Sequence, residues 1–161
     1  MAIIVYNAII KLFHPHSPHV RPQDIWKSEM IELWWDYSIK TISQVRHNKP
    51  DIVFWLPEKK TCCIIDICIP LDENVHKQEK QKVDTYTELK VALLRLYPNY
   101  EIYIVPIVLG ATGVVTTSLV TNLGTIGFNV PGIKTLIPKL QQKAMIGSMR
   151  IVKAAMTMKK E

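Results

Sequence analysis

The chain has 161 residues, of which 48% are hydrophobic and 21% are charged, and its formal net charge is +6. This composition excludes a disordered chain, and the length suits one domain with a hydrophobic core of its own. The excess of positive charge favours an anionic partner, although charge alone identifies none.

The first 22 residues combine an apolar start with a segment rich in proline and histidine. The apolar start lacks the basic beginning and the small-residue cleavage site of a signal peptide, so we expect none. We expect residues 1–22 to form an irregular lead segment and residues 23–161 to form a single domain. His14, His16 and His19 suit an exposed loop, with a metal clip as the alternative.

Residues 24–33 predict a helix, with Gln23 or Asp24 near its cap. Residues 35–42 alternate apolar and polar side chains, which predicts a strand. Two runs rich in isoleucine, valine and aromatic residues follow, at 51–56 and 61–69, and the polar turn between them predicts a β-hairpin.

Three cysteines, Cys62, Cys63 and Cys68, lie in the second strand of this hairpin. Their spacing does not match a zinc site. We interpret them as small apolar strand residues in a reducing compartment.

The second half of the chain predicts a helix over 74–97, a strand over 100–109 and helices over 116–123 and 136–158. Residues 102–133 carry no charge, but prolines and glycines interrupt them, which favours a buried strand and a short helix over a membrane span. The order of elements predicts an α/β fold with helices on a mixed sheet and no membrane association.

Two aspartates, Asp51 and Asp66, should meet in the predicted hairpin, because one opens the first strand and the other lies late in the second. Apolar residues surround Asp66, where an unpaired carboxylate would be costly. Carboxylate oxygens are the ligands that Mg²⁺ prefers. The pair therefore indicates a divalent metal site and phosphodiester chemistry.

Lys82 lies on the apolar stripe of the helix predicted over 74–97. Lysine is rarely buried without a partner, so Lys82 either reaches toward the aspartates or extends its ammonium to solvent at the edge of the stripe. Glu79, one turn earlier, is either a further metal ligand or the ion-pair partner of Lys82. Two carboxylates and a lysine form a minimal set for metal-dependent hydrolysis of DNA.

At this point the sequence resembles the restriction-like endonuclease domain of non-LTR retrotransposon polyproteins, a member of the PD-(D/E)XK nuclease superfamily. The resemblance covers Trp35 to Gly113, with a weaker match from Leu140 to Arg150. The matching pieces occur in order, and they are Trp35–Thr41, Lys49–Val53, Ile64–Pro70, Val75, Lys77–Lys82, Tyr86 and Val105–Gly113.

This resemblance implies a restriction-endonuclease-like core in which Asp51 and Asp66 bind Mg²⁺ or Mn²⁺. Superfamily members often carry a lysine two residues after the second acid, and Cys68 stands there instead. In the retrotransposon branch the lysine lies on the following helix, and Lys82 occupies that place. Such domains nick target DNA, and the exposed end primes reverse transcription.

The resemblance also implies a reverse transcriptase partner that was originally in the same polyprotein, and a nuclear location if the domain functions. A cytoplasmic location is expected otherwise. The chain would then be a fragment or a stand-alone reading frame left by an element. The alternatives are an inactive nucleic-acid-binding remnant of the same fold and a structural or interaction protein.

Contact with DNA is expected from basic residues in two places. No acidic residue lies between Glu101 and Glu161, while lysine and arginine accumulate there, which suits phosphate binding or a solvated helix face. The candidates are Arg46, His47 and Lys49, just before Asp51, and Lys139, Lys143 and Arg150 near the C-terminus.

Overall fold

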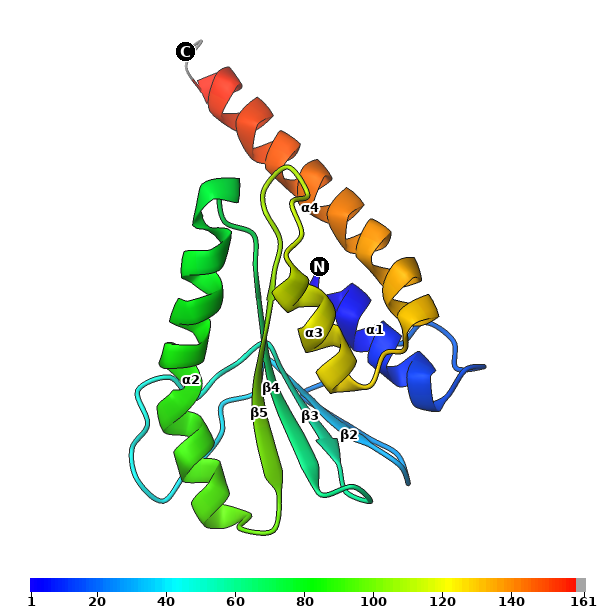
Figure 1. The fold of residues 1–161 in the computed structure, drawn as a ribbon, viewed down its shortest axis with the longest axis vertical. Coiled ribbons are helices and arrows are strands. Elements are labelled where there is room, and N and C mark those ends of the chain that lie inside the picture. The colour runs from blue at the N-terminus through cyan, green and yellow to red at the C-terminus, as the bar shows by residue number, and fades with distance from the viewer. Residues whose placement is uncertain (159–161) are drawn as a thin grey trace.

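A five-stranded sheet with helices on both faces forms the core of the protein (Figure 1). The computed structural model describes residues 1–158. Its strands are β1 (Ile25–Lys27), β2 (Glu32–Trp35), β3 (Ile52–Leu56), β4 (Thr61–Cys68) and β5 (Glu101–Val108). Its helices are α1 (Ala2–Phe13), the short 3-10 helix η1 (Asp72–Asn74), α2 (Val75–Leu96), α3 (Thr117–Ile126) and α4 (Val130–Met158). The expected α/β class with a mixed sheet is confirmed.

The strands follow one another across the sheet in chain order, from β1 to β5. Neighbours from β1 to β4 are antiparallel, and β5 runs parallel to β4 after the crossover through α2. The predicted hairpin is present as β3 and β4. Pro106 lies in β5, which is an edge strand, where a residue without a backbone N–H is tolerated.

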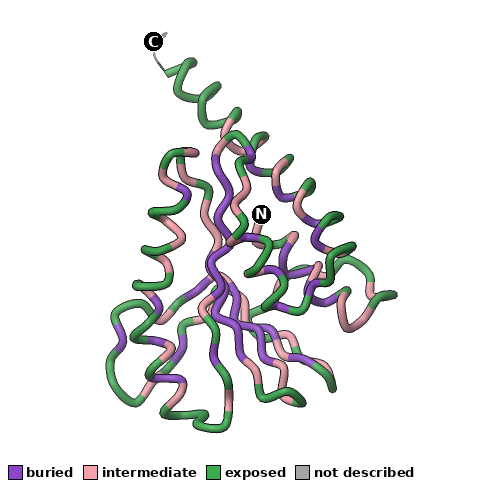
Figure 2. Tube along the Cα trace, viewed as in Figure 1, coloured by how far each residue is buried: buried purple, intermediate pink, exposed green. Residues whose placement is uncertain are grey.

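Two hydrophobic clusters lie on opposite faces of the sheet. On one face, Cys62 and Ile64 of β4 pack in the cluster that contains Leu89 and Leu93 of α2. On the other face, Cys63 and Ile65 pack in the cluster that contains side chains of α1, α3 and α4. Because β4 is buried on both faces, its sequence is apolar almost without alternation, and Figure 2 shows the strands buried between the helices. Cys62 and Cys63 are buried free thiols, as expected for packing residues.

The expected irregular lead segment is wrong for residues 2–13, which form α1. Val5, Tyr6, Ile9 and Ile10 are all at most 1% exposed, and their spacing marks one face of a helix. The buried Asn7 fastens the following loop to this helix, because its side-chain amide donates to the carbonyl of Val20 (3.0 Å) and accepts from its N–H (2.7 Å). The apolar start is therefore part of the core.

The helix expected over 24–33 is also wrong, because this segment contains β1 and the start of β2. Strand pairing explains the difference, because in β2 Leu33 lies opposite Phe54 of β3 and Trp34 lies opposite Val53. These contacts in the sheet outweigh the local preference for a helix. The strand expected over 35–42 is wrong as well, since only Trp35 lies in a strand, as the last residue of β2, and Asp36 after it adopts a left-handed conformation (φ 45°).

The remaining elements agree with expectation to within a few residues, except that α4 starts at Val130 rather than at 136. Pro138 therefore lies inside α4 and not in its first turn. Within residues 1–158, no helix combines the length and the apolar character needed to span a membrane. The last three residues of the expected domain lie outside the described residues.

Candidate active site

Asp51 and Asp66 lie next to each other at one end of the β3–β4 hairpin. Asp51 directly precedes β3, and Ile52 pairs with Ile65, so the antiparallel register carries on to Asp51 and Asp66. Directly opposed residues of an antiparallel pair point to the same face. Alternation along β4 puts Asp66 on the face of Cys62 and Ile64, which α2 covers. The structure thus brings together the two aspartates that the sequence singled out.

Lys82 of α2 reaches this pair. Its Nζ lies 2.6 Å from Oδ2 of Asp66, and the two side chains are 27% and 9% exposed. The ammonium therefore points toward the sheet rather than extending to solvent. Oδ2 of Asp66 is buried. Apart from the ammonium of Lys82, no donor among the described residues contacts it.

Tyr86 is the second side chain that contacts Asp66. Its hydroxyl donates to Oδ1 of Asp66 at 2.7 Å, and the residue is 6% exposed. The sequence alone places Tyr86 only among the pieces that carry the family resemblance. The sequence signal for its contact is its spacing, because residues four apart on a helix lie on the same face and Lys82 is four residues earlier.

The environment of Asp51 disfavours its charged form. Burial raises the pKa of Asp51 above its ordinary value, and the neighbouring charge of Asp66 raises it further. The backbone N–H of Ile67, which donates to Oδ2 of Asp51 at 2.7 Å, and the charge of Lys82 both act in the opposite direction. A carboxylate in this state gains from a nearby cation.

Lys82 keeps its charge in the folded protein. Burial acts to lower its pKa, but the hydrogen bond and the negative charge of Asp66 outweigh burial, and the net direction is upward. Lys82 can therefore supply a positive charge at neutral pH, but it is a poor general base.

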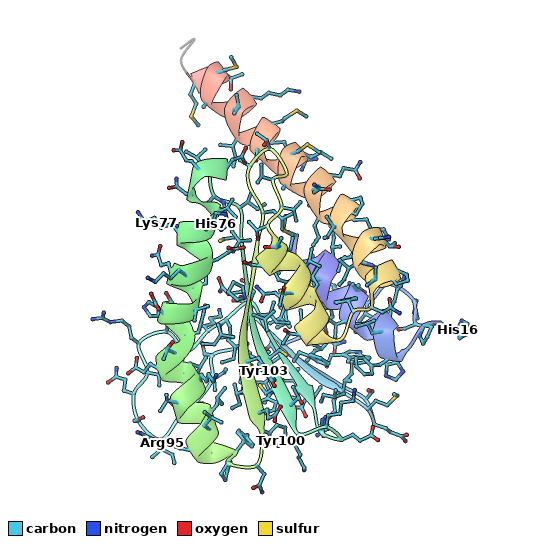
Figure 3. All side chains as sticks on the ribbon, viewed as in Figure 1. His16, His76, Lys77, Arg95, Tyr100 and Tyr103 are labelled. Carbon is cyan, nitrogen blue, oxygen red and sulfur yellow. The ribbon has the colours of Figure 1, made fainter. Side chains whose placement is uncertain are left out.

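Glu79 lies close to this centre but does not pair with Lys82, contrary to one of the two expectations for it. It contacts Nδ1 of His76 at 3.3 Å and accepts a hydrogen bond from the hydroxyl of Thr116, the residue that caps α3. Figure 3 places His76 and Lys77 near the start of α2, and Arg95 at its far end. Glu79 thus joins the first turns of α2 to the start of α3.

Cys68 is half-buried beside the same charges. Burial raises the pKa of its thiol, and the positive charge of Lys82 opposes that change. Within residues 1–158, no group of three or more histidine, cysteine or acidic side chains is arranged to hold a metal ion. Any metal site here would therefore rest on two carboxylates.

The expected DNA-contacting residues lie in two separate places. Arg46, His47 and Lys49 are exposed in the loop before β3, where Lys49 forms an ion pair with Asp36 (3.2 Å). Lys139, Lys143 and Arg150 are exposed on α4. Burial lowers the pKa of the Met1 amine most strongly, the positive charge of Lys143 lowers it further, and the negative charge of Asp51 acts in the opposite direction.

The helices opposite α2 belong to acid-free parts of the chain. Residues 1–23 and 102–158 contain no aspartate or glutamate, and these two segments include α1, α3 and α4. We name this set of helices with their flanking loops the basic layer. Its lysines and arginines are Lys11, Arg21, Lys134, Lys139, Lys143, Arg150 and Lys153.

Comparison of the sequence with models of known protein families finds no match, and comparison with curated proteins finds none either.

Proposed function

We propose that the protein is a metal-dependent DNA endonuclease domain with a restriction-endonuclease-like core, derived from a non-LTR retrotransposon. The observation that carries the proposal is the convergence of Asp51, Asp66 and Lys82, which come from the residue before β3, from β4 and from α2. The mixed sheet with helices on both faces supports it, as does the position of Lys82 on the helix after the second acidic strand.

Asp51 and Asp66 fit a hard divalent cation such as Mg²⁺ or Mn²⁺. Both supply carboxylate oxygens. Among the described residues, Oδ2 of Asp66 contacts only the ammonium of Lys82. The raised pKa of Asp51 reflects chiefly its burial and then the neighbouring charge of Asp66. Mg²⁺ commonly binds one or two carboxylates and fills its remaining positions with water and phosphate. When bound, the cation would lower the pKa of a water molecule and neutralise charge that builds up on the phosphate.

Lys82 and Tyr86 have different roles in this proposal. The Lys82 ammonium, held beside Asp66, stabilises negative charge on the phosphate in the transition state or orients the attacking water. Tyr86 does not touch the substrate. Its hydrogen bond fixes the orientation of Asp66, as supporting residues commonly do for metal ligands.

DNA would reach the site over the basic layer and over the loop of Arg46, His47 and Lys49. Phosphate contacts by lysine and arginine position a duplex without reading its sequence. In this proposal the DNA is a nuclear target, and the original partner is a reverse transcriptase of the same polyprotein.

A plasmid-nicking assay tests the proposal. The full chain should convert supercoiled DNA to open circles with Mg²⁺ or Mn²⁺, and EDTA should stop the reaction. Asp66→Ala should remove the activity. Asp84→Ala is the matched control, because Asp84 is an exposed acid of α2. Equal rates for the wild type and Asp66→Ala would reject the enzyme. DNA binding without cleavage by the wild type would support the inactive nucleic-acid-binding remnant instead.

A further inference from the structure

The C-terminal half of α4 carries an apolar surface that no other part of residues 1–158 covers. In the first half, Ile133, Leu136, Leu140 and Ala144 are at most 8% exposed and belong to the core. Beyond Ala144 the helix stays apolar, but it projects past the body of the protein (Figures 1 and 2). Large apolar side chains are therefore in water, among them Met149 (56% exposed), Ile151 (73%) and Met156 (64%).

Part of this surface is a groove of about 520 Å³ between α4 and the loop that follows β5. We name it the methionine groove. Its helical wall is formed by Met145, Met149, Val152 and Met156, and Ala111 and Thr112 form the facing wall. Spacings of four, three and four residues mark one face of a helix and are the spacings that a second helix packs against.

The charged side chains of α4 around the methionine groove are all positive. Lys153 lines it, Arg150 follows Met149 directly, and α4 has no carboxylate. On the loop side Asp72 is engaged locally, because its carboxylate accepts hydrogen bonds from the backbone N–H (3.1 Å) and the hydroxyl of Thr112. A complementary partner therefore carries acidic side chains beside its apolar ones. A second copy of α4 would instead oppose Arg150 and Lys153 with the same charges.

The apolar side chains favour a protein over a lipid surface. Helices that lie in membrane interfaces usually insert tryptophan, phenylalanine or leucine. Residues 141–158 contain none of these and contain four methionines. Methionine is flexible and polarisable, and it adapts to the side chains of a protein partner. The concave shape also suits a helix better than a flat bilayer.

We propose that the methionine groove binds an acidic amphipathic helix of another protein. Apolar side chains of that helix would fill the groove at helical spacing, and its carboxylates would meet Arg150 and Lys153. This is the helix-in-groove mode of recognition. It does not depend on the proposed nuclease activity.

Fluorescence anisotropy with the full chain and a designed peptide tests this proposal. The peptide has about 20 residues, long enough to become helical, with leucines at spacings of three and four and glutamates on both flanks. Met149→Glu should weaken its binding at least about tenfold, as expected for a central contact. Val120→Glu is the control, because Val120 is an exposed residue of α3 (44%). Since both positions are exposed, neither change should unfold the protein.

A peptide with lysine in place of every glutamate should bind at least about tenfold more weakly, because the charges would then repel. Equal binding of the two peptides, or of the wild type and Met149→Glu, would overturn the proposal. The proposal would also be overturned if light scattering showed a dimer of the wild type and a monomer of Met149→Glu, since a second copy of the chain would then occupy the methionine groove. Stronger binding to phosphatidylserine vesicles than to the acidic peptide would overturn it in favour of a membrane.

Discussion

The two faces of the sheet differ in how they use charge. On the α2 face, Lys82 and Tyr86 each contact the carboxylate of Asp66 at hydrogen-bonding distance. On the opposite face, the basic layer has seven lysines and arginines and no acid. Paired charges in a partly buried site suit chemistry on a bound phosphate, whereas unbalanced charges on a surface suit binding of a polyanion. The comparison predicts that changes on the first face alter reaction rate and that changes on the second alter affinity.

The largest effect should follow Lys82→Ala. The nicking rate should fall by about 10³, because a charge placed for the transition state typically contributes 10²–10³. The rate of DNA nicking at saturating DNA measures this effect. Lys77→Ala, at an exposed lysine of the same helix, should leave the rate unchanged. A loss of DNA affinity with an unchanged rate would show that Lys82 binds DNA instead, and it would contradict the expected difference between the two faces.

A comparable effect on stability should follow Ile9→Ala on the basic-layer face. Ile9 lies on the buried face of α1 and is 0% exposed, so the change should lower the free energy of unfolding by about 3 kcal/mol through lost burial and a cavity. Urea denaturation measures it. Ile3→Ala in the same helix, where Ile3 is 45% exposed, should cost far less. Equal small losses would show that α1 is not part of the core.

These residues also show how far the sequence predicts the structure. The β3–β4 hairpin, the apolar stripe of α2 and the meeting of Asp51 with Asp66 follow from local pattern, because turn residues and periodicity are local signals. The β1–β2 hairpin does not follow, because its pairing with β3 is set by distant residues. The helix α1 is harder to predict because a proline- and histidine-rich loop follows it directly, although Val5, Tyr6, Ile9 and Ile10 have the spacing of one helical face.

The site was predicted in part for similar reasons. The spacing of Lys82 marks it as a lysine on an apolar stripe, but only the fold shows that its partner is Asp66 and not Glu79. The role of Tyr86 depends on a hydrogen bond across the helix–sheet interface, which no local pattern encodes.

A smaller effect should follow Tyr86→Phe, which removes the hydrogen bond to Asp66 and keeps the ring. The nicking rate should fall by about tenfold, the usual order for a residue that orients a metal ligand. Titration of the rate with Mg²⁺ separates this role from a structural one, because the variant should need more Mg²⁺ while its unfolding transition changes little. An unchanged Mg²⁺ requirement would contradict the positioning role.

The pH dependence of metal binding tests whether the cation binds the ionised carboxylate of Asp51. The pKa of Asp51 is higher in the folded protein than in the unfolded chain. As pH rises above the pKa of the unfolded chain, the folded protein therefore loses stability, and a cation bound to the ionised carboxylate offsets that loss. Mg²⁺ should therefore raise the midpoint of thermal unfolding near pH 8, by about 1–4 °C. This gain should disappear as pH falls through the raised pKa of Asp51. A gain that is independent of pH would show that Mg²⁺ binds elsewhere.

The smallest effect is expected on the basic layer. Lys139→Ala with Lys143→Ala should weaken DNA binding by a few-fold and reduce the slope of log affinity against log salt by about 0.9 for each lost phosphate contact. The nicking rate at saturating DNA should stay the same. Filter binding over a series of salt concentrations measures the slope, and an unchanged slope would remove these lysines from the DNA path.

Nicking kinetics of Asp51→Ala, Asp66→Ala and the double variant in Mg²⁺ test whether the two aspartates form one catalytic centre. If both aspartates hold one metal, each single change should reduce nicking to background, and the double variant should be no slower than either, because residues that act as a unit are not additive. A wild type that nicks no faster than Asp51→Ala, or losses that multiply in the double variant, would contradict a shared catalytic centre.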